Sequence, residues 1–232
     1  MSRAPQAPVI TVDGPVGSGK GAVSFLLAEH LDFHLLDSGA LYRIVALARG
    51  RRGIPDDDEA ALASLASELD MRFERGTQQS PVVIMVDGED VSEAIRSESC
   101  GQGASQLAAM PAVRTALLKR QRACRRAPGL VADGRDMGTV VFPAAKAKIY
   151  LTASPEERAQ RRYKQLIAKG IGVNLAALRG EITERDKRDR ERAVAPLKPA
   201  EDAVTIDTTG LDVDAVMARA MEIVALRGLD AG

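Results

Sequence analysis

The sequence predicts an α/β fold, built on a five-stranded parallel sheet that is flanked by helices. Helical patterns separate several short apolar runs, and a glycine-rich loop follows the first of these runs. The alternation is typical of a doubly wound sheet, in which every parallel pair of strands needs a crossover of a dozen or more residues. The runs that fit buried strands cover residues 9–12, 34–37, 129–132, 147–151 and 203–206.

We expect a single domain, residues 1–232, whose core is interrupted twice. The first interruption, at about 38–97, combines helical patterns with alternating strand-like pieces and is expected to be an α+β insert. The second, at about 155–197, is rich in arginine and begins with Ser154 as a helix cap and Pro155 at the first helical position. This hairpin is interpreted as a lid or, alternatively, as an ordinary solvated hairpin. The core would then be 1–37, 98–154 and 198–232.

Within the insert, helices are expected at 40–51 and 59–69, and strands at 71–75, 82–86 and 89–91. Helices are also expected near 98–109 and 112–126, with Pro111 between them, and another helix begins near residue 175.

The composition excludes several classes of function. Lys and Arg number 32, as do Asp and Glu, so the net charge is zero and no polyanion-binding surface is indicated. Aromatic residues make up 3%, with no Trp, which argues against stacking on single-stranded nucleic acid. Two cysteines and two histidines are too few for a zinc motif or a disulfide framework. The short polar N-terminus and the lack of a long apolar run predict a cytoplasmic protein with no membrane or nucleic-acid partner.

A phosphate-binding loop is the most informative motif. Residues 9–12 are apolar and β-branched, and they lead into Gly14 and then Gly19-Lys20 before a helical pattern. Such a loop folds into a nest of N–H groups at a helix N-terminus, where phosphate oxygens bind, with the lysine on the terminal phosphates. The alternative is a glycine-rich turn before a surface lysine. The loop predicts binding of a nucleoside triphosphate.

This loop departs from the usual pattern, because Gly21 stands where a Ser or Thr commonly binds magnesium. Ala22 also has no hydroxyl group, and Ser18 and Ser24 carry the nearest ones. Magnesium would therefore be held by other groups, in part through water.

Two other predicted strands end in polar residues. The run at 129–132 leads into Asp133, followed by Arg135 and Asp136, and the run at 34–37 ends in Asp37 before Ser38. Open α/β sheets bind their ligands at the carboxyl ends of their strands, so a carboxylate at 133 suits indirect magnesium coordination. The alternative is a structural Asp in a turn.

The segment 184–192 alternates acidic and basic residues. In a helix, Arg185, Asp189 and Arg192 share one face, which would suit phosphate oxygens and sugar hydroxyls. A solvated helix laced with salt bridges is the alternative.

Together, residues 13–21, 35–43, 88–92, 104–106, 132–143 and 185–197 resemble the bacterial cytidylate kinase family. These motifs are long and extend over nearly the whole chain, from 9 to about 206. The resemblance implies the P-loop nucleoside monophosphate kinase fold, with a monophosphate-binding insert and a helical lid. It implies a transferase of pyrimidine nucleotide metabolism that uses ATP and Mg²⁺ to phosphorylate CMP or dCMP. We expect a monomer.

The resemblance also implies site roles. It assigns catalysis to Lys20, Arg135, Arg192 and Asp133. It assigns ATP binding to the loop and the lid, namely to Gly14, Pro15, Val16, Gly17, Ser18, Gly19, Lys20, Gly21, Ala22, Arg158 and Arg162. It assigns CMP binding to Ser38, Arg43, Ser105, Arg114, Arg135, Asp136, Arg185, Asp189 and Arg192. No residue would bind the metal directly, although Asp133 would lie near it. The family usually has Thr at position 22, so Ala22 removes one hydroxyl contact to ATP.

Two other hypotheses remain. A kinase for UMP or for a hydroxylated metabolite is one, and Asp37 would be its candidate base. The other is a nucleotide-dependent switch, but the Asn-Lys-x-Asp motif that reads guanine in switch GTPases is absent from this sequence.

Overall fold

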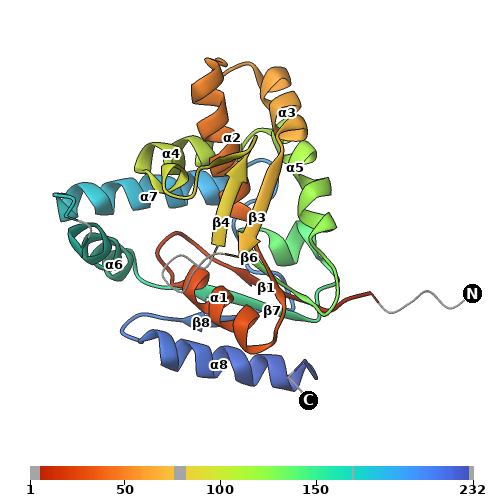
Figure 1. Ribbon diagram of the computed structural model, residues 1–232. Coiled ribbons are helices and arrows are strands. Elements are labelled where there is room, and N and C mark those ends of the chain that lie inside the picture. Colours follow the sequence, from red (N-terminus) through yellow and green to blue (C-terminus); the bar gives the residue numbers. More distant parts are fainter. Residues whose placement is uncertain (1–5, 76–81, 169, 230–232) are drawn as a thin grey trace, which may run out of the picture. The chain divides into compact units, whose positions relative to one another are not determined.

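The computed structural model describes residues 6–75, 82–168 and 170–229, and it divides into two compact units, shown in Figure 1. One unit combines residues 1–37 with 121–232, and the other is residues 38–120. Most of the N-terminal segment used for the localisation prediction lies outside the described residues. Within them, no helix has both the length and the apolar character that crossing a membrane requires.

The first unit contains the predicted parallel sheet, in the strand order β2-β6-β1-β7-β8. All five strands were predicted within two residues at each end, and they are β1 (Val9–Asp13), β2 (His34–Asp37), β6 (Leu130–Gly134), β7 (Ala147–Thr152) and β8 (Val204–Asp207). Because their carboxyl ends share one edge, Asp133 lies opposite Asp37 and beside Val12 in the strand register.

Helices α1 (Lys20–His30) and α8 (Val213–Leu226) pack on each other and on the sheet in this unit. The shared core includes Ile10, Leu27, Val131, Ile149 and Val224, all almost completely buried. Burial of such β-branched and aliphatic side chains is the main stabilising contribution in a domain of this kind. The core holds the first strand and its following loop in a fixed position.

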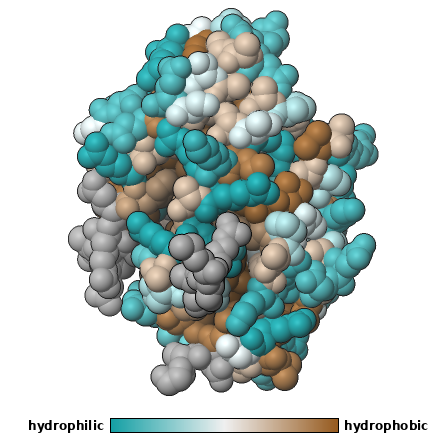
Figure 2. Space-filling model, turned by 90° about the vertical axis from the view of Figure 1, so that its right-hand side faces the viewer, coloured by the Kyte–Doolittle hydropathy of each residue, from teal (hydrophilic) through white to brown (hydrophobic). Residues whose placement is uncertain are grey.

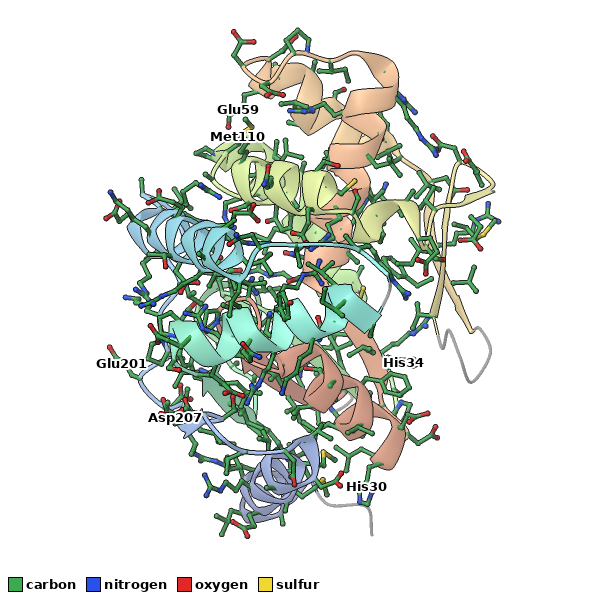
Figure 3. The ribbon with its side chains drawn as sticks, turned by 90° about the vertical axis from the view of Figure 1, so that its left-hand side faces the viewer. His30, His34, Glu59, Met110, Glu201 and Asp207 are labelled. Atoms are coloured by element: carbon green, nitrogen blue, oxygen red, sulfur yellow. The ribbon has the colours of Figure 1, made fainter. Side chains whose placement is uncertain are left out.

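The predicted arginine-rich hairpin is formed by α6 (Pro155–Ala168) and α7 (Leu175–Glu191). The predicted cap is confirmed, because the Ser154 hydroxyl accepts a hydrogen bond from the Glu157 N–H at 3.2 Å. Asn174 caps α7 in the same manner. In Figures 1 and 3, α6 lies between α7 and α1, and the two hairpin helices pack along each other.

The second unit holds a three-stranded sheet in the order β3-β4-β5 and several helices. Its strands, all antiparallel as paired, are β3 (Met71–Arg75), β4 (Val82–Val86) and β5 (Glu89–Asp90). The predicted short third strand is confirmed, and Asp87-Gly88 forms the turn before it with positive φ at both residues. The helical elements are α2 (Ser38–Arg52), α3 (Glu59–Glu68), a 3₁₀ turn (Ala94–Arg96), α4 (Glu98–Leu107) and α5 (Pro111–Ala123), whose last three residues belong to the first unit.

This unit extends to Arg120, beyond the insert boundary of 97 that we expected from sequence. The physical reason is the packing of α4 on α2. Gly101 of α4 faces Arg43 so closely that an added Cβ would lie 3.0 Å from its Nη2 atom, and Gly103 faces Ala46. These small residues let two helices approach closely, which a sequence read one element at a time does not reveal.

Figure 2 shows hydrophilic and hydrophobic residues interspersed over the face in view.

Candidate active site

The loop between β1 and α1 has the geometry of a phosphate-binding nest. Gly14, Gly17 and Gly19 all have positive φ, and α1 begins directly after them at Lys20. A Cβ on Gly14 would lie 2.1 Å from the carbonyl oxygen of Leu151, so only glycine fits there. Gly19 and Gly21 are exposed at the start of the helix, where N–H groups have no partner within a helix.

The carbonyl groups of this loop are held by the protein. Val16 accepts a hydrogen bond from Arg158 at 3.1 Å, and Ser18 accepts one from the Thr208 hydroxyl at 3.1 Å. Gly19 accepts one from the N–H of Val23 as α1 begins. A carbonyl that is fixed in this way cannot turn toward a polyphosphate, whose oxygens would repel it.

Lys20 and Asp133 form the charged centre of the site. Burial, together with the charge of Arg135, lowers the pKa of Lys20 to about 8. Burial, together with the charge of Asp37, raises the pKa of Asp133 to about 7, while Lys20 and Arg135 act in the opposite direction. The pKa values of both groups are thus shifted toward neutral pH. Such perturbed groups are typical of functional sites.

Gly21 and Asp133, two residues with predicted site roles, lie close together. The Oδ2 atom of Asp133 would lie 3.4 Å from a Cβ on Gly21, so the carboxylate lies directly over the start of α1. Among the described residues, the Asp133 Oδ1 atom and the Ser18 hydroxyl are buried with no hydrogen-bond partner. Buried oxygens of this kind are suited to accept a hydrogen bond from a ligand or an ordered water. Ala22 is exposed in the first turn of α1, and nothing in the structure explains its departure from the family pattern.

A second charged cluster joins β6 to α7. Asp189 is almost completely buried, and its carboxylate accepts hydrogen bonds from Nε of Arg135 at 3.0 Å and from Nη2 of Arg192. Burial alone would raise the pKa of Asp189, but Arg135, Arg192 and Arg185 together lower it. The Asp189 carboxylate on α7 therefore holds two guanidinium groups in place, that of Arg135 from the loop after β6 and that of Arg192, which directly follows the last residue of α7.

The loop after β6 is anchored by a residue to which the sequence analysis gave no role. Asp13, at the end of β1, accepts hydrogen bonds from the N–H groups of Met137 and Gly138, each at 2.8 Å. Burial raises the pKa of Asp13 to about 7, although these two hydrogen bonds lower it. A π-helical turn (Met137–Val141) begins there, directly after the buried Asp136. In the sequence, the feature that could have indicated this role of Asp13 is its position at the end of a buried strand, directly before a loop.

Arg158 has a different placement from the predicted contact with ATP phosphates. Its guanidinium is 1% exposed and forms two hydrogen bonds with the Asp186 carboxylate, at 3.0 and 2.5 Å. Its remaining contacts are with the carbonyl groups of Ala153 and Val16. The side chain therefore supports the loop from behind and joins it to both hairpin helices. The partner, Asp186, was not given a role from sequence.

Arg162 donates a hydrogen bond to the side chain of Gln165 at 3.4 Å on α6. Its neighbour Arg161, which the sequence did not single out, is the one whose Nη1 atom would lie 3.8 Å from a Cβ on Gly19. Two adjacent arginines in a charged helix are indistinguishable by composition, and only the direction in which each side chain leaves the helix separates them.

The remaining predicted CMP residues lie in the second unit. Ser38 and Ser105 are buried, and Arg114, also buried, donates hydrogen bonds to the Tyr42 hydroxyl at 3.4 Å and to the Ala108 carbonyl at 3.2 Å. Arg43 donates to the carbonyl groups of Ile95 and Ser97. Packing of α2 against α4 thus holds these polar side chains inside the unit.

No group of three His, Cys, Asp or Glu suited to a metal ion occurs in the described part of the chain. The two histidines, labelled in Figure 3, lie in or beside α1 and β2, and His34 contacts the Ala127 carbonyl.

Comparisons with known proteins identify the family. The model of the family described as cytidylate kinase matches residues 10–226. The cytidylate kinase of Stutzerimonas stutzeri is 60% identical over 222 residues, which cover 96% of this chain and 97% of that protein. The cytidylate kinase of Shewanella baltica strain OS155 is 56% identical over 219 residues, or 94% and 95% of the two chains. A crystal structure of an uncharacterized protein from Eubacterium ventriosum shares the fold at 12% identity, with a TM-score of 0.53 over 95% of this chain and 99% of that chain. With motifs, sheet and phosphate loop in agreement, this chain belongs to the cytidylate kinase family.

Proposed function

We propose that this chain is an ATP-dependent kinase that transfers the γ-phosphoryl group of ATP to CMP or dCMP, giving CDP or dCDP and ADP. The observation that carries the proposal is the arrangement of cations beside the phosphate loop. Lys20 lies near Arg135, and Arg135 shares the Asp189 carboxylate with Arg192. A loop for one polyphosphate and a fixed pair of guanidinium groups for a second phosphate are what transfer between two nucleotides requires.

The chemistry needs little from the protein beyond position and charge. The acceptor is a phosphate oxygen whose second pKa lies near 6, so it is largely anionic at neutral pH without a general base. Lys20, Arg135 and Arg192 would stabilise the negative charge that spreads during in-line transfer. The α6–α7 hairpin would cover the nucleotides and limit the access of water.

Mg²⁺ fits the residues at this site. The buried Oδ1 of Asp133 and the Ser18 hydroxyl have no hydrogen-bond partner among the described residues, and oxygen atoms of this kind suit the water shell of a magnesium ion. Bound with ATP, the ion would neutralise part of the charge on the phosphates. Asp133 would hold it through water, and no protein residue is proposed as a direct ligand.

The base of the acceptor would be selected by the chemistry of Asp136. Cytosine presents an amino donor beside ring acceptors, which a carboxylate together with Arg114 and Ser105 would complement. Uracil presents a carbonyl at the position of the amino group and would meet the Asp136 carboxylate unfavourably. The sugar would be held by Arg185 and Asp189 and the phosphate by Arg43, Arg135 and Arg192, and Ser38 would also contribute to CMP binding.

The test is a coupled assay of ADP formation with CMP, dCMP, UMP, AMP and shikimate as acceptors at fixed ATP and magnesium. We expect the highest kcat/KM with CMP or dCMP, and little ADP without an acceptor. A higher kcat/KM with UMP, AMP or shikimate would contradict the proposal and would identify that compound as the acceptor instead. ATP hydrolysis that CMP does not change would favour a nucleotide-dependent switch.

A further inference from the structure

A chain of contacts links the lid helix α6 to the back of the phosphate loop through Thr208. This residue follows directly after β8, whose last residue, Asp207, is labelled in Figure 3. It is 1% exposed, and its N–H donates to the Thr152 carbonyl at 2.8 Å. Its backbone is therefore fixed to the end of β7, inside the sheet that also carries the loop.

The hydroxyl of Thr208 contacts one hydrogen-bond donor and one hydrogen-bond acceptor. The Arg161 Nη1 atom lies 3.0 Å from Oγ1, and the Ser18 carbonyl lies 3.1 Å from it. A guanidinium can only donate hydrogen bonds, so the hydroxyl accepts from Arg161 and its own proton is left for Ser18. The direction of the hydrogen bond to the loop follows from the chemistry of its partners.

Arg161 is itself held by several contacts. Its Nη2 atom donates to the Thr208 carbonyl at 2.5 Å and to the Leu211 carbonyl at 3.3 Å, and its Nε atom donates to Glu157 at 2.9 Å. All three nitrogen atoms of the planar Arg161 guanidinium group thus donate hydrogen bonds, which fixes its orientation. The Thr208 hydroxyl is therefore held between Arg161 on one side and the Ser18 carbonyl on the other.

Ser18 is fully buried, so its carbonyl needs a donor from within the protein. If the Thr208 hydroxyl were removed, the peptide between Ser18 and Gly19 would be free to rotate its carbonyl toward the phosphate side. That rotation would also turn the Gly19 N–H away from the nest. The shape of the anion-binding loop thus depends on a hydroxyl that lies 190 residues away in sequence.

We propose that Thr208 is a positioning residue of the ATP site, which fixes the phosphate loop through the Ser18 carbonyl and is itself oriented by Arg161. The inference rests on the proposed use of this loop for ATP. Thr208 itself is assigned no contact with substrate. The contact also gives α6 a second connection to the loop, beside the bond from Arg158 to Val16.

The test compares Thr208→Val, which removes the hydroxyl at constant shape, with Thr208→Ser, which retains it. Thr205→Val, the same change at an exposed position of β8, is the matched control. We expect Thr208→Val to raise the KM for ATP about tenfold, because a buried carbonyl loses its donor, and to leave the KM for CMP within about threefold. Thr208→Ser and Thr205→Val should resemble the wild type.

Amide hydrogen exchange of the loop provides a readout that does not depend on activity. Peptides covering residues 14–20 should exchange faster in Thr208→Val than in the wild type, and Thr208→Ser should restore slow exchange. Peptides from β1 should be unchanged. Unchanged loop exchange in Thr208→Val, or equal increases in both KM values, would overturn the inference. A wild type that forms no ADP from CMP would contradict the proposed function instead, and the exchange result would still decide the role of Thr208.

Discussion

The phosphate loop and the cluster of Asp189 with Arg135 and Arg192 both present positive charge, yet they are built in different ways. The loop relies on backbone geometry, with three glycines at positive φ and carbonyl groups that the protein holds. The cluster relies on side chains, because the Asp189 carboxylate holds Arg135 and Arg192. The first arrangement leaves no space for an added atom at Gly14, and the second depends on one buried carboxylate.

This difference predicts which kind of substitution damages each region. A backbone nest is sensitive to a single methyl group and tolerates changes of charge nearby. A buried ion cluster tolerates small changes of shape but not the loss of a charge, because the remaining charges stay buried without compensation.

The largest expected effect follows from adding a methyl group to the loop. In Gly14→Ala the new Cβ would lie 2.1 Å from the Leu151 carbonyl, in a strand that is hydrogen-bonded to a neighbour on each side. We expect the free energy of unfolding to fall by roughly 3 kcal/mol or more, and ATP binding to be lost. Chemical denaturation and ATP titration measure the two effects.

Gly21→Ala is the matched control for stability. Its Cβ would lie 3.4 Å from Asp133 Oδ2, an ordinary contact, at a helical position. Its unfolding free energy should stay within about 1 kcal/mol of the wild type. Equal destabilisation by the two variants would contradict a loop built on the close approach at Gly14.

A smaller but selective effect is expected from Asp189→Asn. Two guanidinium groups would lose their shared carboxylate, so we expect the free energy of unfolding to fall by about 3 kcal/mol. The KM for CMP should rise at least about tenfold, and the KM for ATP should change much less. Asp214→Asn, the same change at an exposed residue of α8, should alter stability by less than about 0.5 kcal/mol. An equal rise in both KM values would argue against separate sites for the two substrates.

The mildest effect concerns pH. A lysine whose pKa is lowered to about 8 is charged below that pH and neutral above it. ATP affinity of the free protein should therefore decrease as pH rises through 8, by at most about tenfold per pH unit for one proton. Titration calorimetry at pH 7, 8 and 9 measures this decrease. Lys20→Arg stays charged and should remove it, whereas a decrease that persists in this variant would assign the titration to another group.

Local sequence patterns were sufficient to predict most of the fold. All five parallel strands, both hairpin helices and the Ser154 cap agree with the structure, because each is determined by periodicity or by a residue type with a strong positional preference. The phosphate loop could be predicted equally well, since its residues are contiguous in the sequence.

Contacts between segments that are distant in sequence could not be predicted from local patterns. Asp13, Asp186 and Thr208 act through partners 124, 28 and 190 residues away. Arg158 and Arg161 lie on one charged helix, and no local pattern indicates that Arg158 contacts Asp186 while Arg161 contacts Thr208. The extent of the second unit to Arg120 likewise depends on how closely α4 packs on α2, which no local pattern indicates.

Selection of cytosine by Asp136 is tested most directly by the ratio of kcat/KM for CMP to kcat/KM for UMP, measured in the wild type and in Asp136→Asn. Asparagine keeps the shape of the side chain but exchanges one acceptor oxygen for a donor, which suits uracil better than cytosine. We predict a wild-type ratio well above one that falls at least about tenfold in the variant. Equal losses with both acceptors, which would leave the ratio unchanged, would contradict a site that selects cytosine through Asp136.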